Sequence, residues 1–172
     1  LNGMVLKLPI NKNNDPKSIQ LSPKIKYLNS KTIALFLPFK ANSINFDSLQ
    51  IAKQQVKRDG YVRVSTEFYT GVEMALDSAK ALGISVNLDV YDTEANPIKL
   101  RRLIREIEFS KYDLILGPAT AQNCKILSNS LELDKIALFS PFVKFDKRSS
   151  NLIQTIPNDD WISKKLLTHA AK

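Results

Sequence analysis

The hydrophobic positions of this chain fall into short apolar runs separated by amphipathic segments, a pattern that predicts alternating strands and helices. Residues 32–37 (TIALFL) and 113–116 (DLIL) are almost wholly apolar, which is typical of central strands buried on both faces. Residues 135–139 predict another buried strand, and residues 151–156 one more. Residues 84–91 instead alternate apolar and polar positions, which predicts an edge strand with one solvated face.

Apolar residues spaced three and four apart predict helices between these strands. The clearest helix spans residues 66–82, and another spans residues 120–131. Asn96 followed by Pro97 predicts a helix start, since asparagine caps helices and proline suits their first turn. A last helix is predicted from residue 157 onward. This alternation predicts an α/β fold, a doubly wound and mostly parallel sheet with helices on both faces.

The connection after the first strand, residues 40–64, is long and polar and contains Asp59-Gly60. Leu49, Ala52 and Val56 have helical spacing, so a short helix can form within it. Long connections in compact domains commonly carry function or are disordered.

Composition and charge narrow the class of protein. The 172 residues are 44% hydrophobic and 24% charged, as in ordinary globular domains, and no apolar run approaches the roughly 18 residues of a membrane span. The formal charge is +8, but the basic residues are scattered, and no aromatic residues interleave their densest cluster, which lies within residues 99–105. We therefore predict no nucleic-acid partner. The sequence starts at Leu1 without a signal-like leader, so we expect any targeting signal to lie outside it.

Catalytic and cofactor motifs are missing where this fold would carry them. Pro38 to Lys40 follow the first strand without a glycine-rich phosphate loop, and there is no G-x-S-x-G elbow. The single cysteine, Cys124, falls on a predicted apolar helix face, and the single histidine is His169. One cysteine and one histidine predict no metal site and no internal disulfide. We expect neither a cofactor nor enzymatic activity.

A small-ligand site is better supported. In an open α/β sheet, ligands bind beyond the carboxyl ends of the strands, and the turn at residues 117–120 leads there from strand into helix. The free N–H groups of such a helix start suit a carboxylate or another anion. Neighbouring strand ends add a hydroxyl and aromatic walls. The alternative is that these turns merely end the strands. The predicted ligand-binding residues are Phe39, Lys40, Gly117, Pro118, Ala119, Thr120, Ser140 and Phe142.

Several segments, in this order, resemble the first lobe of a type I periplasmic binding protein of the Leu/Ile/Val-binding kind. They are IALFLPF, FYTGVEMALDSAKALG, DVYDTE at residues 89–94, LILGPAT, IALFSPF and NLIQTIPNDD. The resemblance covers residues 31–172 and implies two lobes around a cleft. Residues 31–150 would form lobe one, and residues 151–172 would cross into a second lobe that is largely missing. Such a truncated lobe exposes apolar surface, so self-association is possible.

The sequence departs from the family at the site. Amino-acid receptors of this family usually place a serine four residues after the glycine of the Gly-Pro turn, where this chain has Ala121. After the Ser-Pro of the fourth strand they place small residues and a threonine, where this chain has Phe142, Val143 and Lys144. The resemblance therefore implies that the usual clamp for an α-amino acid is mostly absent.

Residues 1–9 (LNGMVLKLP) resemble the last strand of a LysM peptidoglycan-binding module, and a polar linker follows to about residue 30. Together the two resemblances favour a non-catalytic cell-envelope module in a bacterium. Its partners would be peptidoglycan or the enzymes that synthesise it. The alternative is the solute-binding component of an ABC transporter for amino acids or another small polar ligand. Either function predicts a location in the periplasm or cell envelope.

Overall fold

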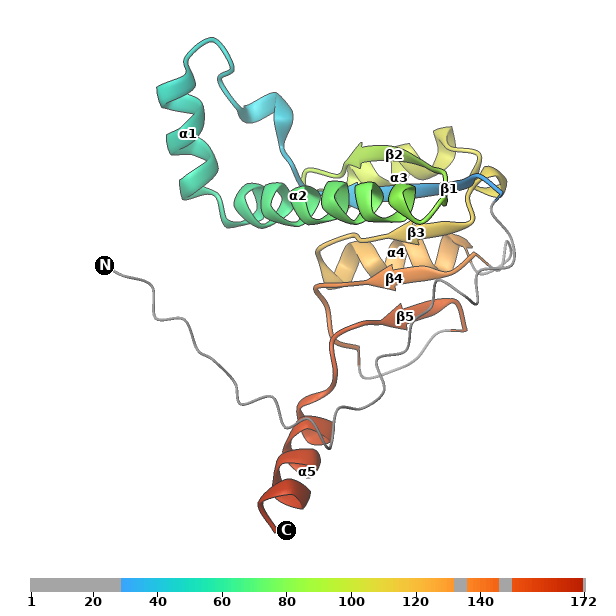
Figure 1. Cartoon of the computed structure of the whole chain (residues 1–172). Coiled ribbons are helices and arrows are strands. Elements are labelled where there is room, and N and C mark those ends of the chain that lie inside the picture. Colours follow the sequence, from blue (N-terminus) through green and yellow to red (C-terminus); the bar gives the residue numbers. More distant parts are fainter. Residues whose placement is uncertain (1–28, 132–135, 146–149, 172) are drawn as a thin grey trace.

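The computed structural model describes residues 29–131, 136–145 and 150–171 (Figure 1). The LysM-like residues 1–9 and most of the linker lie outside the described residues. So does residue 135, where the fourth predicted strand was expected to begin.

The centre of the fold is a 5-stranded sheet in the order β2-β1-β3-β4-β5, in which every neighbouring pair is parallel. Parallel neighbours require crossover connections, and amphipathic helices supply them here. The α/β fold predicted from the alternating pattern is confirmed. The strands are β1 (Lys31–Leu37), β2 (Val86–Asp92), β3 (Leu114–Leu116), β4 (Leu138–Ser140) and β5 (Leu152–Gln154).

The helices follow the predicted order, with one early start. Asn96 accepts hydrogen bonds from the backbone N–H groups of Ile98 and Lys99, as expected of a helix cap. The second helix begins at Gly60, before the predicted residue 66, because the Asp59 side chain caps it. The helices are α1 (Leu49–Arg58), α2 (Gly60–Ala81), α3 (Pro97–Glu106), α4 (Ala121–Leu131) and α5 (Asp159–Ala170), with 3-10 turns η2 (Ala41–Ser43) and η3 (Phe109–Lys111).

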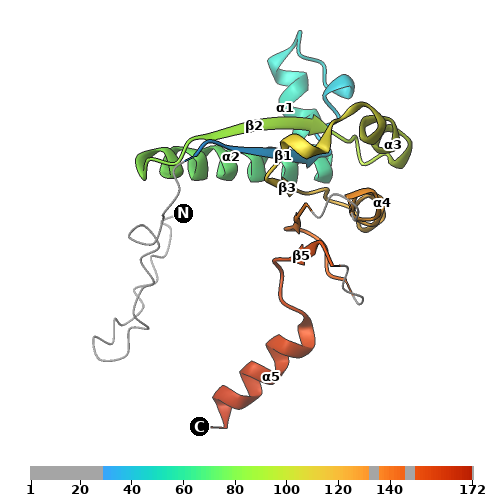
Figure 2. The ribbon, with the colours of Figure 1, turned by 90° about the vertical axis from the view of Figure 1, so that its right-hand side faces the viewer.

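The helices lie on both faces of the sheet, as predicted. The chain steps one way from β1 to β2 and the other way from β2 through β3 to β4. Right-handed crossovers therefore place α2 on one face and both α3 and α4 on the other (Figures 1 and 2). Helix α1 stands beyond the ends of the strands, and α5 stands apart from the sheet at the far end of the chain (Figure 1).

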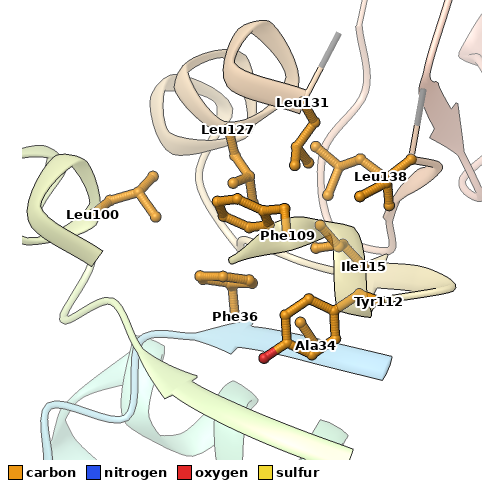
Figure 3. Packing of buried hydrophobic residues seen from close by; sticks show 10 residues of the cluster. Ala34, Phe36, Leu100, Phe109, Tyr112, Ile115, Leu127, Leu131 and Leu138 are labelled. Atoms are coloured by element: carbon orange, nitrogen blue, oxygen red, sulfur yellow. The ribbon is translucent and has the colours of Figure 1, made fainter. Parts of the chain in front are cut away.

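The main core lies between the sheet and the α3–α4 layer. Phe109 lies between Phe36 of β1 and the leucines of α4 (Figure 3), with the Phe36 and Phe109 ring centroids 6.4 Å apart. Full burial of each large apolar side chain contributes roughly 1.5–3 kcal/mol. The buried members are Ala34, Phe36, Leu100, Phe109, Tyr112, Ile115, Leu127, Leu131, Ile136 and Leu138.

The edge strand β2 differs from its prediction. The face expected to be solvated carries Tyr91, whose ring stacks on Phe36 at a centroid distance of 4.9 Å. The hydroxyl groups of Tyr91 and Tyr112 lie 2.5 Å apart, and Tyr112 donates to Asp89 at 2.6 Å. Val90, on the opposite face, is 41% exposed. Alternation identified which residues share a face, but the packing of η3 and Tyr112 covers the face that was expected to be solvated.

Candidate functional site

The carboxyl ends of β1, β3 and β4 meet at one edge of the sheet because the three strands are parallel neighbours. This arrangement brings the predicted site segments together. They are the residues after β1 (Phe39 and Lys40), the turn after β3 (residues 117–120) and the residues around the end of β4 (Ser140 and Phe142).

A hollow of about 400 Å³ lies at this edge, lined by Gly60, Tyr61, Val64, Ala119 and Phe142. Two of these residues, Ala119 and Phe142, belong to the predicted site. The other three come from the first turns of α2, which the sequence pattern assigned to a loop. An Asp-Gly pair ahead of helically spaced apolar residues was the signal that could have revealed them, since aspartate is a preferred helix cap. None of the five lining residues carries a charge.

Aromatic contacts hold two predicted residues against α2. The Phe142 ring meets the Phe68 ring edge-on, with centroids 4.8 Å apart. The Phe39 ring meets Tyr69 in the same manner at 5.8 Å. Edge-to-face pairs of this kind contribute roughly 0.5–1.5 kcal/mol beyond their buried area. Phe142 therefore presents a fixed wall to the hollow, whereas Phe39 packs beside α2 and is not among the lining residues.

The turn after β3 is shaped by Gly117, which has a φ of 95° and precedes a cis peptide bond to Pro118. The Gly117 N–H donates to the Phe139 carbonyl oxygen at 2.9 Å, which ties the turn to β4. A Cβ atom at Gly117 would lie 2.1 Å from the Phe36 carbonyl oxygen. Gly117 and Pro118 are buried, so they shape the turn that leads from β3 to Ala119.

The two predicted hydroxyl groups have partners within the chain. The Thr120 hydroxyl oxygen accepts a hydrogen bond from the Asn123 N–H at 3.3 Å, at the start of α4. Ser140 is fully buried, and its hydroxyl donates to the Val143 carbonyl oxygen at 3.4 Å. The structure therefore directs Ser140 into the interior rather than into the hollow. Whether Thr120 or Ser140 contacts a ligand stays a prediction.

Cys124 lies beside Ser140 in the interior. Its thiol donates to the Pro118 carbonyl oxygen at 2.9 Å and lies 3.7 Å from the Ser140 hydroxyl. Burial raises the pKa of Cys124 to about 11, although the Ser140 hydrogen bond acts in the opposite direction. The thiol is therefore neutral at physiological pH and serves packing, as predicted from its apolar helix face.

Lys40 is bound within the chain through both its backbone and its side chain. Its ammonium group lies 2.6 Å from an Asp59 carboxylate oxygen and 5.1 Å from the centroid of the Tyr61 ring. Its backbone N–H donates to the Asp92 carboxylate at 3.0 Å. The hydrogen bond from Lys40 holds the pKa of Asp59 below its ordinary value, although desolvation opposes the shift. The positive charge predicted at this strand end therefore has a counterion already.

Across the described ranges, no cluster of His, Cys, Asp and Glu side chains has the arrangement of a metal site. Among the helices that the structure describes, none is long and apolar enough to cross a membrane.

The parallel sheet with helices on both faces matches one lobe of the type I periplasmic binding protein fold, as comparison with solved structures shows. Three similar solved structures are a Desulfitobacterium hafniense ABC transporter substrate-binding protein in complex with Leu, the leucine-binding protein LivK of Thermotoga maritima, and an R. palustris solute-binding protein in complex with benzoate. Their TM-scores are 0.56, 0.57 and 0.55, at 17%, 16% and 18% sequence identity.

The similarity covers most of this chain and a smaller share of the others. It covers 83%, 83% and 74% of this chain, and 39%, 37% and 32% of the three structures in the same order. The chain thus spans less than half of the length of the solved structures that it matches. No protein-family model and no curated protein sequence matches it. At these identities the likeness shows the fold alone, and the LysM context has no counterpart in these matches.

Proposed function

We propose that residues 31–150 form one lobe of a two-lobed, non-catalytic solute-binding protein of the ABC transporter type. The observation that carries this proposal is the hollow of about 400 Å³ at the shared carboxyl edge of β1, β3 and β4. Ligands of open α/β sheets bind at this edge. The likeness to substrate-binding proteins supports the same function. Residues 151–171 would then lead toward a second lobe that closes over the hollow, in the periplasm or cell envelope.

The chemistry of the hollow favours a ligand whose buried part is apolar or aromatic. Tyr61, Val64, Ala119 and Phe142 form most of its lining, and the nearest cation, Lys40, is paired with Asp59. Leu and benzoate, which are bound in two of the similar structures, each combine an apolar body with a carboxylate. We expect the backbone N–H groups at the start of α4 to receive the anionic end of such a ligand.

A second candidate function is the envelope module that binds no small ligand and acts on peptidoglycan or its synthetic enzymes. The observation that favours it is the internal pairing of three polar groups that could face a ligand. Lys40 binds Asp59, Thr120 caps α4, and Ser140 bonds Val143. Ala121 also replaces the serine expected in an amino-acid receptor.

Calorimetric titration of the full-length protein separates the two functions. We expect saturable binding of L-leucine or benzoate, and we expect Phe142→Ala to weaken it about tenfold, equivalent to about 1.4 kcal/mol. The variant removes one wall of the hollow. Met74→Ala is the matched control, because Met74 is 67% exposed and does not line the hollow. Binding of muropeptides, without binding of leucine, isoleucine or benzoate, would instead support the envelope module.

A further inference from the structure

Lys40, which follows β1, lies in surroundings that are unusual for a ligand-binding cation. Lys40 adopts a left-handed backbone conformation, with φ 50° and ψ 41°. Residues other than glycine rarely adopt this backbone conformation unless their surroundings impose it. The Asp92 carboxylate supplies that constraint, because it accepts hydrogen bonds from the Lys40 N–H at 3.0 Å and the Ala41 N–H at 2.8 Å. The same carboxylate accepts from the Glu94 N–H at 2.9 Å.

This conformation sends the Lys40 side chain toward the start of α2. Its Nζ atom lies 2.6 Å from Oδ2 of Asp59, while the other oxygen, Oδ1, accepts from the Tyr61 N–H at 2.9 Å and the Val62 N–H at 3.3 Å. One carboxylate oxygen of Asp59 therefore pairs with Lys40, and the other caps the start of α2. An ion pair of this kind fixes the orientation of the cap as well as its charge.

The first turns of α2 are only partly covered on the side of the hollow. They project beyond the strand ends (Figure 1), and their two lining side chains, Tyr61 and Val64, are 47% and 38% exposed. Val62 and Ser65, in the same turns, are buried and anchor this part of the helix through other side chains. The preceding helix α1 has no buried residue that would hold the junction in place. The ion pair between Lys40 and Asp59, together with the Lys40 ammonium over the Tyr61 ring, holds the start of α2.

We infer that Lys40 is a positioning residue, which sets the Tyr61–Val64 wall of the hollow through Asp59 and does not itself bind a ligand anion. The inference rests on the proposed solute-binding function, because only in a solute-binding protein would this wall contact the apolar part of a ligand. It revises the role predicted for Lys40 from the sequence. Asp92 contributes indirectly, because its carboxylate fixes the backbone of Lys40.

The test compares Lys40→Met and Lys40→Arg in the full-length protein. Methionine keeps the length of the side chain and removes its charge, whereas arginine keeps the charge. Lys31→Met is the matched control, because Lys31 lies at the opposite end of β1 and forms a 2.8 Å ion pair with Asp113. Hydrogen exchange at the Tyr61 and Val62 amides reports on the cap. We expect Lys40→Met to speed this exchange about two- to fivefold, the size typical of a partly exposed ion pair.

Two probes of similar shape and different charge separate positioning from direct binding. Calorimetry with benzoate and with neutral benzamide should show that Lys40→Met weakens both by a similar factor, while Lys40→Arg and Lys31→Met leave both near the wild-type affinity. A loss confined to benzoate would identify Lys40 as an anion-binding group and overturn the inference. Unchanged amide exchange in Lys40→Met would overturn it as well. If the wild type binds neither probe, the proposed solute-binding preference fails, and the exchange data alone decide whether Lys40 holds the α2 start.

Discussion

At the scale of single residues, the carboxyl edge of the sheet is held by polar groups that satisfy one another. Asp92 secures the turn after β1, Asp59 joins Lys40 to α2, and Thr120 caps α4. Each of these residues could form a polar contact with a ligand, but each already has a hydrogen-bond or ion-pair partner in the chain. Buried or half-buried polar groups are costly when unpaired, so such internal pairing stabilises this edge of the sheet. What remains open to a ligand is mainly the apolar lining of the hollow.

Gly117 is the residue whose replacement should be felt most strongly. Gly117→Ala combines a φ of 95° with a Cβ atom placed 2.1 Å from the Phe36 carbonyl oxygen, so the backbone must shift. We expect a loss of at least about 2 kcal/mol in the free energy of unfolding, measured by urea denaturation. The shift would also displace the adjacent Ala119 and weaken any ligand binding at the hollow.

Gly71→Ala is the matched control for this prediction. A Cβ atom at Gly71 meets nothing within 4 Å, and the residue lies inside α2. Because alanine is a better helix former than glycine, we expect a gain of about 0.5–1 kcal/mol. Equal stability of the two variants would contradict the strain assigned to the Gly117 turn.

At the scale of elements, caps determine where the helices begin. The Asp59 cap starts α2 within the segment that the sequence pattern assigned to the long polar connection, and Ser48 accepts a hydrogen bond from the Ile51 N–H at the start of α1. These caps turn much of residues 40–64 into helix. The early start of α2 matters for the site, because it brings Tyr61 and Val64 to the hollow.

The cap of α3 provides a quantitative test at this scale. Asn96→Ala removes the side-chain oxygen that accepts from Ile98 and Lys99, at 2.8 and 3.4 Å. We expect a loss of about 1 kcal/mol in the free energy of unfolding, the usual cost of losing such a cap. Asn129→Ala, at an exposed position inside α4, is the control and should be neutral or slightly stabilising. An equal loss in both variants would mean that the Asn96 cap contributes nothing.

At the scale of the whole molecule, α5 presents an exposed apolar surface. Trp161, Leu166 and Leu167 are 57%, 64% and 72% exposed, and the helix stands apart from the sheet (Figures 1 and 2). Exposed large apolar side chains on one helix favour a contact with another surface. In the proposed two-lobed protein, this helix would pack within the second lobe.

Purified residues 1–172 should therefore self-associate as their concentration rises, which sedimentation velocity would detect. Replacing Leu166 and Leu167 together with lysine should shift the population toward monomer, because it removes the two most exposed leucines of α5 and adds charge there. Met74→Lys is the control, since Met74 is similarly exposed but lies on α2, away from this helix. A monomer at every concentration, in both the wild type and the variant, would show that the α5 surface drives no association.

The sequence by itself determined the order and type of the elements and the class of fold. Continuous apolar runs such as residues 32–37 are typical of strands in a sheet covered on both faces, and the Asn96-Pro97 start depends on local backbone chemistry alone. Both kinds of signal are local, so they can be read without knowing the partners. The convergence of the turns at residues 39–40 and 117–120 on one edge also followed, because parallel strands share a direction.

Only the tertiary structure decided what those residues contact. Ser140 turns inward to Val143, Lys40 pairs with Asp59, and Tyr91 packs on Phe36 rather than facing water. The partners of Lys40 and Tyr91 are distant in sequence, and the Ser140 bond depends on the path that the backbone takes after β4. Spacing along the chain carries no record of such partners. The sequence could therefore predict that the turns after β1 and β3 meet at one edge of the sheet, while the packing of α2 decided which residues line the hollow there.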